Sequence, residues 1–179
     1  MNEIDVLDSL QPYYADGVNV TDIEKVKELH NRFQSDFFNG TVVANGVIVK
    51  VKPYKYSNSK KDGLPIDYEE FNEKFVHIIT RTAKASSKKI APKIRAFDEK
   101  RANRIHWIKP ILENCNDKRI TCFKYIENDG TERDYFWFRG KQFIVILEEI
   151  SPDYTLITGF CVDAENTSHY QNKYINREK

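Results

Sequence analysis

The sequence predicts an α+β fold in which helices precede a four-stranded antiparallel sheet. Two observations carry this prediction. Apolar residues recur every three to four positions up to about residue 114, as they do on one face of a helix. From about residue 119 they alternate with polar residues instead, and tight turns separate the alternating runs. That second pattern is typical of an antiparallel meander.

The first helix is predicted to begin after Thr21, because Thr21 and Glu24 have the spacing of a capping box. Asn39-Gly40 ends it, and its apolar face consists of Ile23, Val26, Leu29, His30, Phe33 and Phe37. A hairpin follows, because Asn45-Gly46 separates two β-branched runs. Loop-forming residues fill 57–65, so we expect a helix-plus-hairpin extension over 1–65 and a main α+β domain over 66–179.

Two more helices are expected before the sheet. Asp67 is the predicted cap of a helix that reaches Thr82. A third helix is predicted over 93–114, with an apolar stripe that Pro110 should kink or end early. The strands are predicted over 119–126, 133–139, 141–150 and 154–162, and the polar tail beyond Glu165 has room for a short helix.

Composition excludes several classes of protein. The 179 residues are 40% hydrophobic and 13% aromatic, with a net charge of +1, which fits a folded chain and not a disordered one. No apolar run is long enough to span a membrane. The three cysteines are isolated, the four histidines lack metal-ligand spacing, and the glycine motifs that bind nucleotide phosphates are absent. We therefore expect a cytoplasmic protein with free thiols, no metal and no cofactor.

Arg101 is the first candidate functional residue. It falls in the middle of the apolar stripe of the helix predicted over 93–114, and Arg104 flanks the same stripe. A lone buried guanidinium is too costly, so Arg101 must either pair with a carboxylate of the sheet or line an anion site. The surrounding segment 84–104, which includes Lys88, carries eight basic residues against two acidic ones. It is either a solvated basic face or a phosphate-binding surface.

The strand over 133–139 supplies the second set of candidates. Alternation places Arg133, Tyr135, Trp137 and Arg139 on one face. Cations interleaved with aromatic rings are typical of surfaces that bind single-stranded RNA, although a half-exposed sheet face has the same pattern. Tyr154, Leu156, Thr158 and Phe160 should likewise share a face of the last strand.

The remaining polar candidates are less constrained by the pattern. Lys141 opens a strand at a sheet edge, and His169, Tyr170 and Lys173 lie in the tail. His30 is expected in the core and His106 on the surface.

Four segments together resemble a known nuclease superfamily. They are Arg101-x-x-Arg104-Ile-His-Trp-Ile, Arg133-Asp-Tyr-Phe-Trp, Lys141-Gln-Phe-Ile-Val-Ile-Leu and Tyr154-Thr-Leu-Ile-Thr158-Gly-Phe. Over about residues 70–179 the chain resembles phage-associated members of the barnase–EndoU–colicin E5/D–RelE-like superfamily. Gly159 stands where alanine is usual in that pattern.

The resemblance implies a toxin-like endoribonuclease that cleaves RNA without a metal and leaves a 2′,3′-cyclic phosphate. In that reading Arg101, Arg104 and Lys141 neutralise the phosphate, Thr158 donates a hydrogen bond, and Tyr135 stacks on a base or assists proton transfer. The implied RNA contacts are Lys88, Arg133, Trp137, Arg139, Tyr170 and Lys173. A cognate inhibitor or antitoxin is an implied partner. A non-catalytic RNA-binding module and a protein-interaction domain remain the alternatives.

Overall fold

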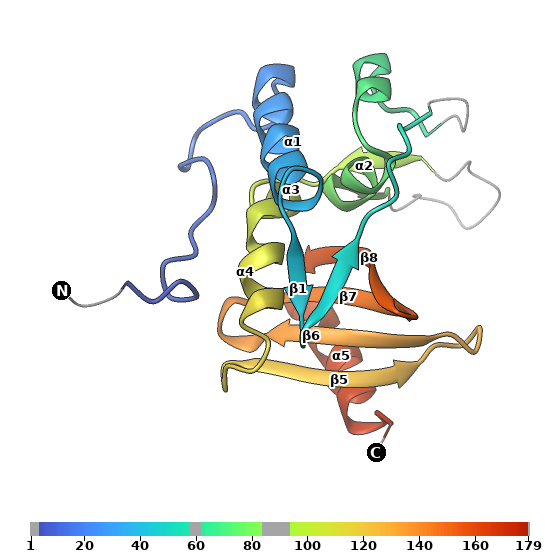
Figure 1. The fold of residues 1–179 in the computed structure, drawn as a ribbon. Helices are drawn as coiled ribbons and strands as arrows, with labels where there is room; N and C mark the ends of the chain where they lie inside the picture. The colour runs from blue at the N-terminus through green and yellow to red at the C-terminus, as the bar shows by residue number, and fades with distance from the viewer. Residues whose placement is uncertain (1–3, 58–61, 84–93, 179) are drawn as a thin grey trace.

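The structure is a computed structural model that describes residues 4–57, 62–83 and 94–178. It has an α+β fold, as the sequence predicts, built on a curled six-stranded sheet of order β1-β2-β8-β7-β6-β5 (Figure 1). The predicted antiparallel meander is confirmed: β5 (Ile120–Ile126), β6 (Glu132–Phe138), β7 (Phe143–Ile150) and β8 (Asp153–Cys161) pair in that order.

The N-terminal hairpin extends this sheet from four strands to six. β1 (Val42–Ala44) and β2 (Val47–Lys50) pair antiparallel, and β2 then pairs parallel with β8. The turn is the predicted Asn45-Gly46, where both residues have positive φ (51° and 77°), as a two-residue hairpin turn of this kind requires. The parallel pairing makes the sheet mixed, a feature that the sequence pattern does not predict.

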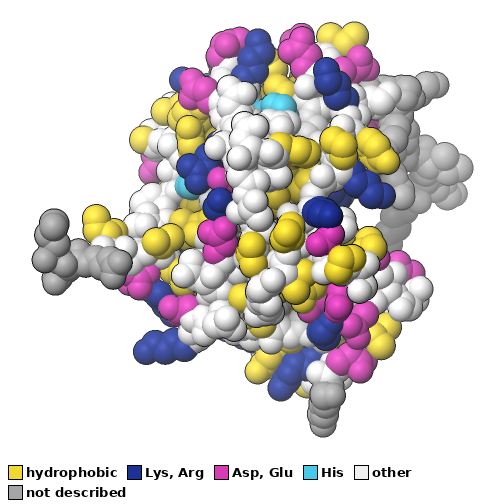
Figure 2. Space-filling model, in the orientation of Figure 1, with side chains coloured by type: hydrophobic (Ala, Val, Ile, Leu, Met, Phe, Trp, Pro, Cys, Tyr) yellow, Lys and Arg dark blue, Asp and Glu magenta, His cyan; other side chains and the backbone are white. Residues whose placement is uncertain are grey.

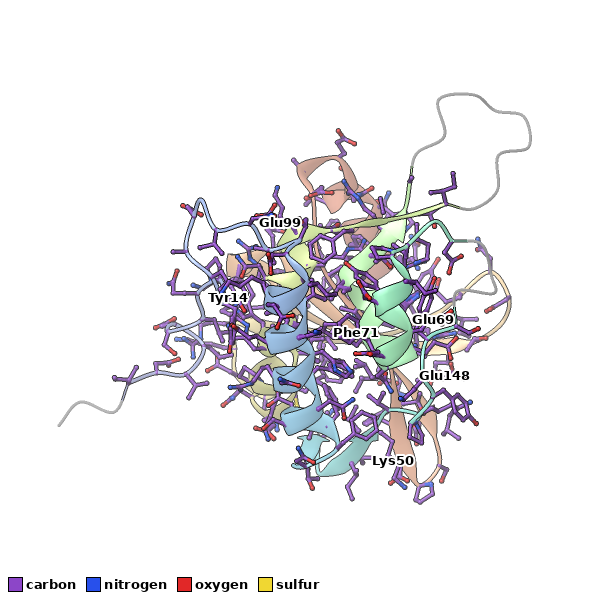
Figure 3. All side chains as sticks on the ribbon, turned by 90° about the horizontal axis from the view of Figure 1, so that it is seen from above. Tyr14, Lys50, Glu69, Phe71, Glu99 and Glu148 are labelled. Atoms are coloured by element: carbon purple, nitrogen blue, oxygen red, sulfur yellow. The ribbon has the colours of Figure 1, made fainter. Side chains whose placement is uncertain are left out.

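Three helices cover one face of the sheet and enclose the main core. They are α1 (Ile23–Phe37), α2 (Glu73–Ile79) and α4 (Ile108–Glu113). Figure 3 shows Phe71 between α1 and α2, where its ring lies 4.9 Å from that of His30 and 5.6 Å from that of Phe75. The caps differ from those expected, because Asp22 and not Thr21 caps α1, and Asn72 and not Asp67 caps α2. Asp67 lies instead in the 3₁₀ turn η2 (Ile66–Glu70).

The single helix predicted over 93–114 is wrong. The described part of this segment forms β4 (Arg95–Phe97), α3 (Glu99–Ala102), the 3₁₀ turn η3 (Ile105–Trp107) and α4. β4 pairs with β3 (Thr80–Thr82), which fixes the chain in an extended form just before Asp98. The Asp98 carboxylate then accepts a hydrogen bond from the backbone N–H of Arg101 and starts a new helix. Pro110 lacks an N–H donor and sits in the first turn of α4, where none is needed.

The opposite face of the sheet is covered by the tail. α5 (Thr167–Ile175), preceded by the turn η5 (Ala164–Asn166), confirms the expected tail helix. Tyr170 and Tyr174 of α5 pack on a second apolar cluster that belongs to this face: Phe123, Tyr135, Trp137, Ile144, Ile146, Phe160 and Val162.

A β-bulge in β8 changes which of its residues face α5. Ile146 pairs with Thr158 but the next residue, Leu147, pairs with Leu156, so Ile157 is an extra residue in β8. Tyr154 and Leu156 therefore face the main core, whereas Phe160 belongs to the cluster under α5. The expectation that Tyr154, Leu156, Thr158 and Phe160 share one face is wrong for this reason.

Candidate active site

A row of basic side chains runs along the seam between α2 and β8. Lys74 and His77 lie one turn apart on α2, and Arg81 follows in β3. At one end the Lys74 Nζ donates a hydrogen bond to the Ile157 carbonyl oxygen, 2.9 Å away. At the other end the Arg81 Nη1 lies 3.6 Å from the Asp163 Oδ2. His77 lies between Lys74 and Arg81 in sequence, and it lines a cavity of about 200 Å³ with Tyr56, Asp62, Glu73, Val76 and Arg95.

The charged groups that act on His77 are three cations and one carboxylate, that of Glu73. The Arg95 guanidinium donates to its backbone oxygen at 2.9 Å, and the charges of Lys74, Arg95 and Arg101 all act on the ring. Part of the side chain is exposed, yet enough protein surrounds the ring to disfavour the imidazolium form. Burial first, and then these three cations, lower the pKa of His77 to about 4.

Arg101 lies next to this histidine site. Its Nε is 3.3 Å from the Asp98 Oδ2, and its guanidinium carbon lies 5.3 Å from the centre of the Phe160 ring. Asp98 also lies 3.5 Å from the Arg81 Nε, so one carboxylate is shared by two guanidinium groups. Arg101 is thus paired, as one interpretation of the sequence required, but with the cap of its own helix and not with a carboxylate of the sheet. Burial lowers its pKa, and Asp98 opposes that effect.

Thr158 of β8 and Tyr170 of α5 lie near Phe160, whose ring Arg101 also contacts. Thr158 pairs with Ile146 and is half-buried beyond the bulge. The Tyr170 ring packs 5.3 Å from the Phe160 ring, and the charge of Arg101 acts on its hydroxyl. Burial raises the pKa of Tyr170, so its hydroxyl stays protonated at neutral pH. We refer to Lys74, His77, Arg101, Thr158 and Tyr170 as the His77 site.

Arg104 lines a cavity of about 520 Å³ beside the His77 site. Its walls also include Arg81, Asp98, Glu99, Cys161 and Asp163. Figure 3 shows Glu99 on the same side of α1 as Tyr14, which belongs to the segment that precedes α1. The Arg104 guanidinium carbon lies 5.2 Å from the centre of the Trp107 ring, and the Lys141 Nζ lies 5.8 Å from the same ring. Buried Trp107 therefore lies between Arg104 of this cavity, whose wall is of mixed charge, and Lys141, which lines a second, basic cavity.

The second basic cavity holds about 400 Å³ and is lined by four cations. These are Lys118, Arg119, Arg139 and Lys141, and Asp8, Thr121, Phe138 and Gly140 complete the wall. Arg139 lies between two rings, 4.0 Å from the centre of Trp137 and 5.0 Å from that of Tyr174. Lys141 donates to the Leu10 carbonyl oxygen at 2.8 Å. Arg139 and Lys141 thus come together here and not in the His77 site.

The aromatic face of β6 is buried beneath α5. Tyr135 and Trp137 are only 2% and 1% exposed. The Tyr135 hydroxyl hydrogen-bonds to Glu127 and accepts from the Lys173 Nζ at 2.8 Å. Burial and Glu127 raise the pKa of Tyr135. In this conformation these rings cannot stack on bases, because α5 covers them. Alternation along a strand predicts which residues share a face, but it does not predict what covers that face.

Arg133 lies near Lys74, on which its charge acts. Its Nη2 lies 3.3 Å from the Glu148 Oε2, and the residue lines a separate cavity of about 390 Å³ with Glu127, Ile146 and Ile157. Lys88 lies outside the described residues, as does most of the basic stretch that precedes residue 94. Figure 2 shows basic and acidic side chains interspersed over the face in view, with no single large basic area.

Sequence reasoning missed His77 and singled out histidines with other roles. His30 accepts a hydrogen bond from the backbone N–H of Asn72 at 3.0 Å and packs in the core, as expected. His106 is partly buried, and its Nε2 donates to the Gln11 carbonyl oxygen at 3.0 Å. His169 is exposed on α5. The sequence feature that could have indicated His77 is its spacing of three residues from Lys74, which places both on the polar side of a helix whose other side is apolar.

Two further findings bear on function. Within the described ranges, no group of histidine, cysteine and acidic side chains is arranged to hold a metal ion, and no helix is long and apolar enough to cross a bilayer. In the comparisons with known proteins, no family model, curated protein or solved structure matches the chain.

Proposed function

We propose that this protein is a metal-independent endoribonuclease that cleaves single-stranded RNA at the His77 site. The observation that carries the proposal is a neutral histidine on which three cations and the Glu73 carboxylate act, on a helix whose Lys74 hydrogen-bonds to the strand that bears Thr158. A phosphodiester is an anion that such a site can neutralise on several sides at once. The nuclease resemblance of residues 70–179 supports RNA as the class of substrate.

The proposed reaction uses side chains of this chain alone. His77 is neutral and accepts the proton of the ribose 2′-hydroxyl, whose oxygen then bonds to the adjacent phosphorus. Arg101 and Lys74 neutralise the charge that develops on the phosphoryl oxygens, and Thr158 donates a hydrogen bond to one of them. The bond from phosphorus to the 5′-oxygen breaks, and the protonated Tyr170 hydroxyl supplies a proton to that leaving oxygen.

The basic surface beyond the His77 site supports a strand of several nucleotides. Arg104 and Lys141 flank Trp107, and Arg139 lies in the adjoining cavity. Phosphates on either side of the cleaved bond would contact these side chains. Because the 2′-hydroxyl is the nucleophile, DNA would bind the same surface without being cut.

The product ends test this reaction directly. A short RNA incubated with the protein in EDTA should yield fragments with a 2′,3′-cyclic phosphate and a 5′-hydroxyl, identified by mass spectrometry. The same strand with 2′-O-methyl riboses should remain intact. Fragments with a 5′-phosphate, or cleavage of the methylated strand, would contradict attack by the 2′-hydroxyl.

A non-catalytic RNA-binding module is the second candidate. The favouring observation is that Tyr135 and Lys173, two of the residues implied by the nuclease resemblance, are held in an internal cluster with Glu127. This candidate predicts salt-sensitive RNA binding and intact RNA after prolonged incubation. A cognate inhibitor protein belongs only to the nuclease proposal, in which it would cover the His77 site.

A further inference from the structure

The N-terminal arm, residues 4–22, places its own carboxylates in the second basic cavity. Arg119 donates to the Asp5 Oδ2 at 2.8 Å through Nη2, and to the Asp8 Oδ1 at 2.7 Å through Nη1. A third carboxylate, Asp117, accepts from the Arg119 Nε at 2.8 Å and is two residues away in sequence. Asp117 is therefore the local partner of Arg119, whereas Asp5 and Asp8 come from more than 100 residues away.

The arm holds these carboxylates in place through apolar anchors. Leu7 and Leu10 are 1% and 6% exposed and belong to the main core. The Asp5 Oδ1 accepts from the backbone N–H groups of Leu7 and Asp8, which forms a tight turn. The two carboxylates nevertheless lie at the surface, with 47% and 71% of their side chains exposed. They can turn away from Arg119 without removing Leu7 or Leu10 from the core.

The cavity suits a phosphate better than it suits these carboxylates. Besides Arg119, it presents Lys118, Arg139 and Lys141. A carboxylate on an exposed side chain gains little from one surface ion pair. A phosphate of a bound strand would contact several of the four cations together and would release their counterions.

We propose that this cavity is a second binding site for the RNA strand, and that Asp5 and Asp8 occupy it until a phosphate displaces them. The arm thereby weakens RNA binding to the resting protein. The inference rests on the proposed function for the identity of the anion as RNA. It does not depend on cleavage, because the cavity lies apart from the His77 site.

The test measures binding of a fluorescent single-stranded 2′-O-methyl RNA, which lacks the 2′-hydroxyl nucleophile. The variant Asp5→Asn/Asp8→Asn removes both charges but keeps the Oδ1 acceptor of the turn. We expect it to bind roughly three- to ten-fold more tightly than the wild type at low salt. A plot of the logarithm of its binding constant against the logarithm of salt concentration should become steeper by roughly 0.7 for each additional phosphate that the protein neutralises.

A matched control separates a local effect from a change of net charge. Asp67→Asn/Glu70→Gln removes the same charge from the exposed turn η2, far from the arm in Figure 1. The gain in RNA affinity of the Asp5→Asn/Asp8→Asn variant should exceed that of this control. It should disappear when Arg119→Gln is added to the Asp5→Asn/Asp8→Asn variant. Lys118→Gln, a change at an exposed residue of the same cavity, should reduce it as well.

Two results would overturn the inference. One is an equal change in affinity for the arm variant and the η2 control. The other is a tightening that persists in both the Arg119→Gln and Lys118→Gln backgrounds. Because the probe cannot be cleaved, neither result bears on catalysis, and loss of catalysis on natural RNA would leave the binding comparison intact.

Discussion

His77 derives its chemical character from neighbours that are distant in sequence. Lys74 lies on the same helix, but Arg95 and Arg101 reach the ring from β4 and α3. Together with burial they keep the imidazole neutral at neutral pH, as a general base must be. An anion bound at the site would reverse part of this effect, because it would offset the three positive charges.

Titration of His77 tests this description of its surroundings. In the free protein we expect its ring protons to titrate with a pKa of about 4 in an NMR pH series. Saturating inorganic phosphate should raise that pKa by about one unit or more. A His77 pKa that is insensitive to phosphate would contradict an anion site here.

Arg101 allows a catalytic role to be separated from a structural one. Arg101→Ala should lower the rate of RNA cleavage by about 10²–10³, the typical loss when one donor to a developing oxyanion is removed. Arg101→Lys should also be impaired, because an ammonium cannot reproduce bidentate phosphate geometry. The neighbouring Lys100→Ala, at an exposed position, is the control and should retain activity.

The outcome for Arg101→Ala depends on whether its pair with Asp98 is structural. If that pair serves only stability, the variant should melt at a lower temperature and keep its turnover. Melting temperature and cleavage are therefore measured on the same preparation, and a destabilised but fully active variant would exclude Arg101 from catalysis.

For single residues, the sequence argument about Arg101 was complete, whereas the argument about Tyr135 lacked the element that covers it. A guanidinium on an apolar stripe must be paired or must line a site, and Arg101 is paired with Asp98 beside the His77 site. Tyr135 lay on the face that alternation predicts, but the tail helix α5 covers that face. Contacts between segments this far apart in the chain are not encoded in any local pattern.

Among the secondary-structure elements, α2 has the most direct influence on the His77 site. Its cap, Asn72, is 4% exposed and makes three side-chain hydrogen bonds: it accepts from the N–H groups of Lys74 and Phe75 and donates to the Lys52 carbonyl oxygen. These bonds fix the start of the helix that carries Lys74 and His77.

Asn72→Ala should therefore lower both stability and activity. Loss of the cap and of the bond to Lys52 should reduce the free energy of unfolding by about 2 kcal/mol. Asn72→Asp keeps the capping acceptor and should lie between the wild type and the alanine variant. Urea unfolding measures the first effect, and cleavage per folded molecule measures the second. Equal stability of the alanine variant and the wild type would contradict the structural role of this cap.

The elements were predictable where local chemistry alone decides them. The Asn45-Gly46 turn and the four strands of the meander follow from turn chemistry and alternation. The helix predicted over 93–114 failed because an extended pairing, β3 with β4, competes with a helical pattern. The bulge at Ile157 was not predictable, since one extra residue in a strand leaves the alternation of apolar residues almost unchanged.

Across the whole molecule, three histidines with lowered pKa values couple stability to pH. Burial lowers the pKa of His30, His77 and His106 to about 4, from an ordinary value of 6.5. Between pH 6.5 and 4 the unfolded chain binds protons that the folded chain does not, so stability falls as the pH falls. Buried Asp36 and Asp134, whose pKa values are raised, act in the opposite direction at the lower end of this range.

We expect the free energy of unfolding to decrease by about 2 kcal/mol between pH 7 and pH 4.5. The figure is smaller than the full shifts would give, because none of the three histidines is fully buried and His77 is exposed. Urea titrations at the two pH values measure it. His30→Gln should weaken the pH dependence and His169→Gln should not, and an unchanged pH dependence in His30→Gln would contradict the contribution of His30.

The net charge of the whole chain does not indicate its proposed binding surface. A net charge of +1 gives no indication of nucleic-acid binding, yet one cavity collects Lys118, Arg119, Arg139 and Lys141. The compensating acidic residues include Asp5 and Asp8 of the arm. Only the folded arrangement brings these four cations together, so composition could not predict the surface.

The central claim is that His77 performs acid–base chemistry on RNA without a metal. The most direct measurement is the cleavage rate of a fluorogenic single-stranded RNA in EDTA for the wild type, His77→Ala and the control His169→Ala. We predict cleavage by the wild type and His169→Ala, and a rate at least about 100-fold lower for His77→Ala, as is typical when a general base is removed. Equal rates for His77→Ala and the wild type, or a wild type that cleaves RNA only when EDTA is omitted, would contradict the claim.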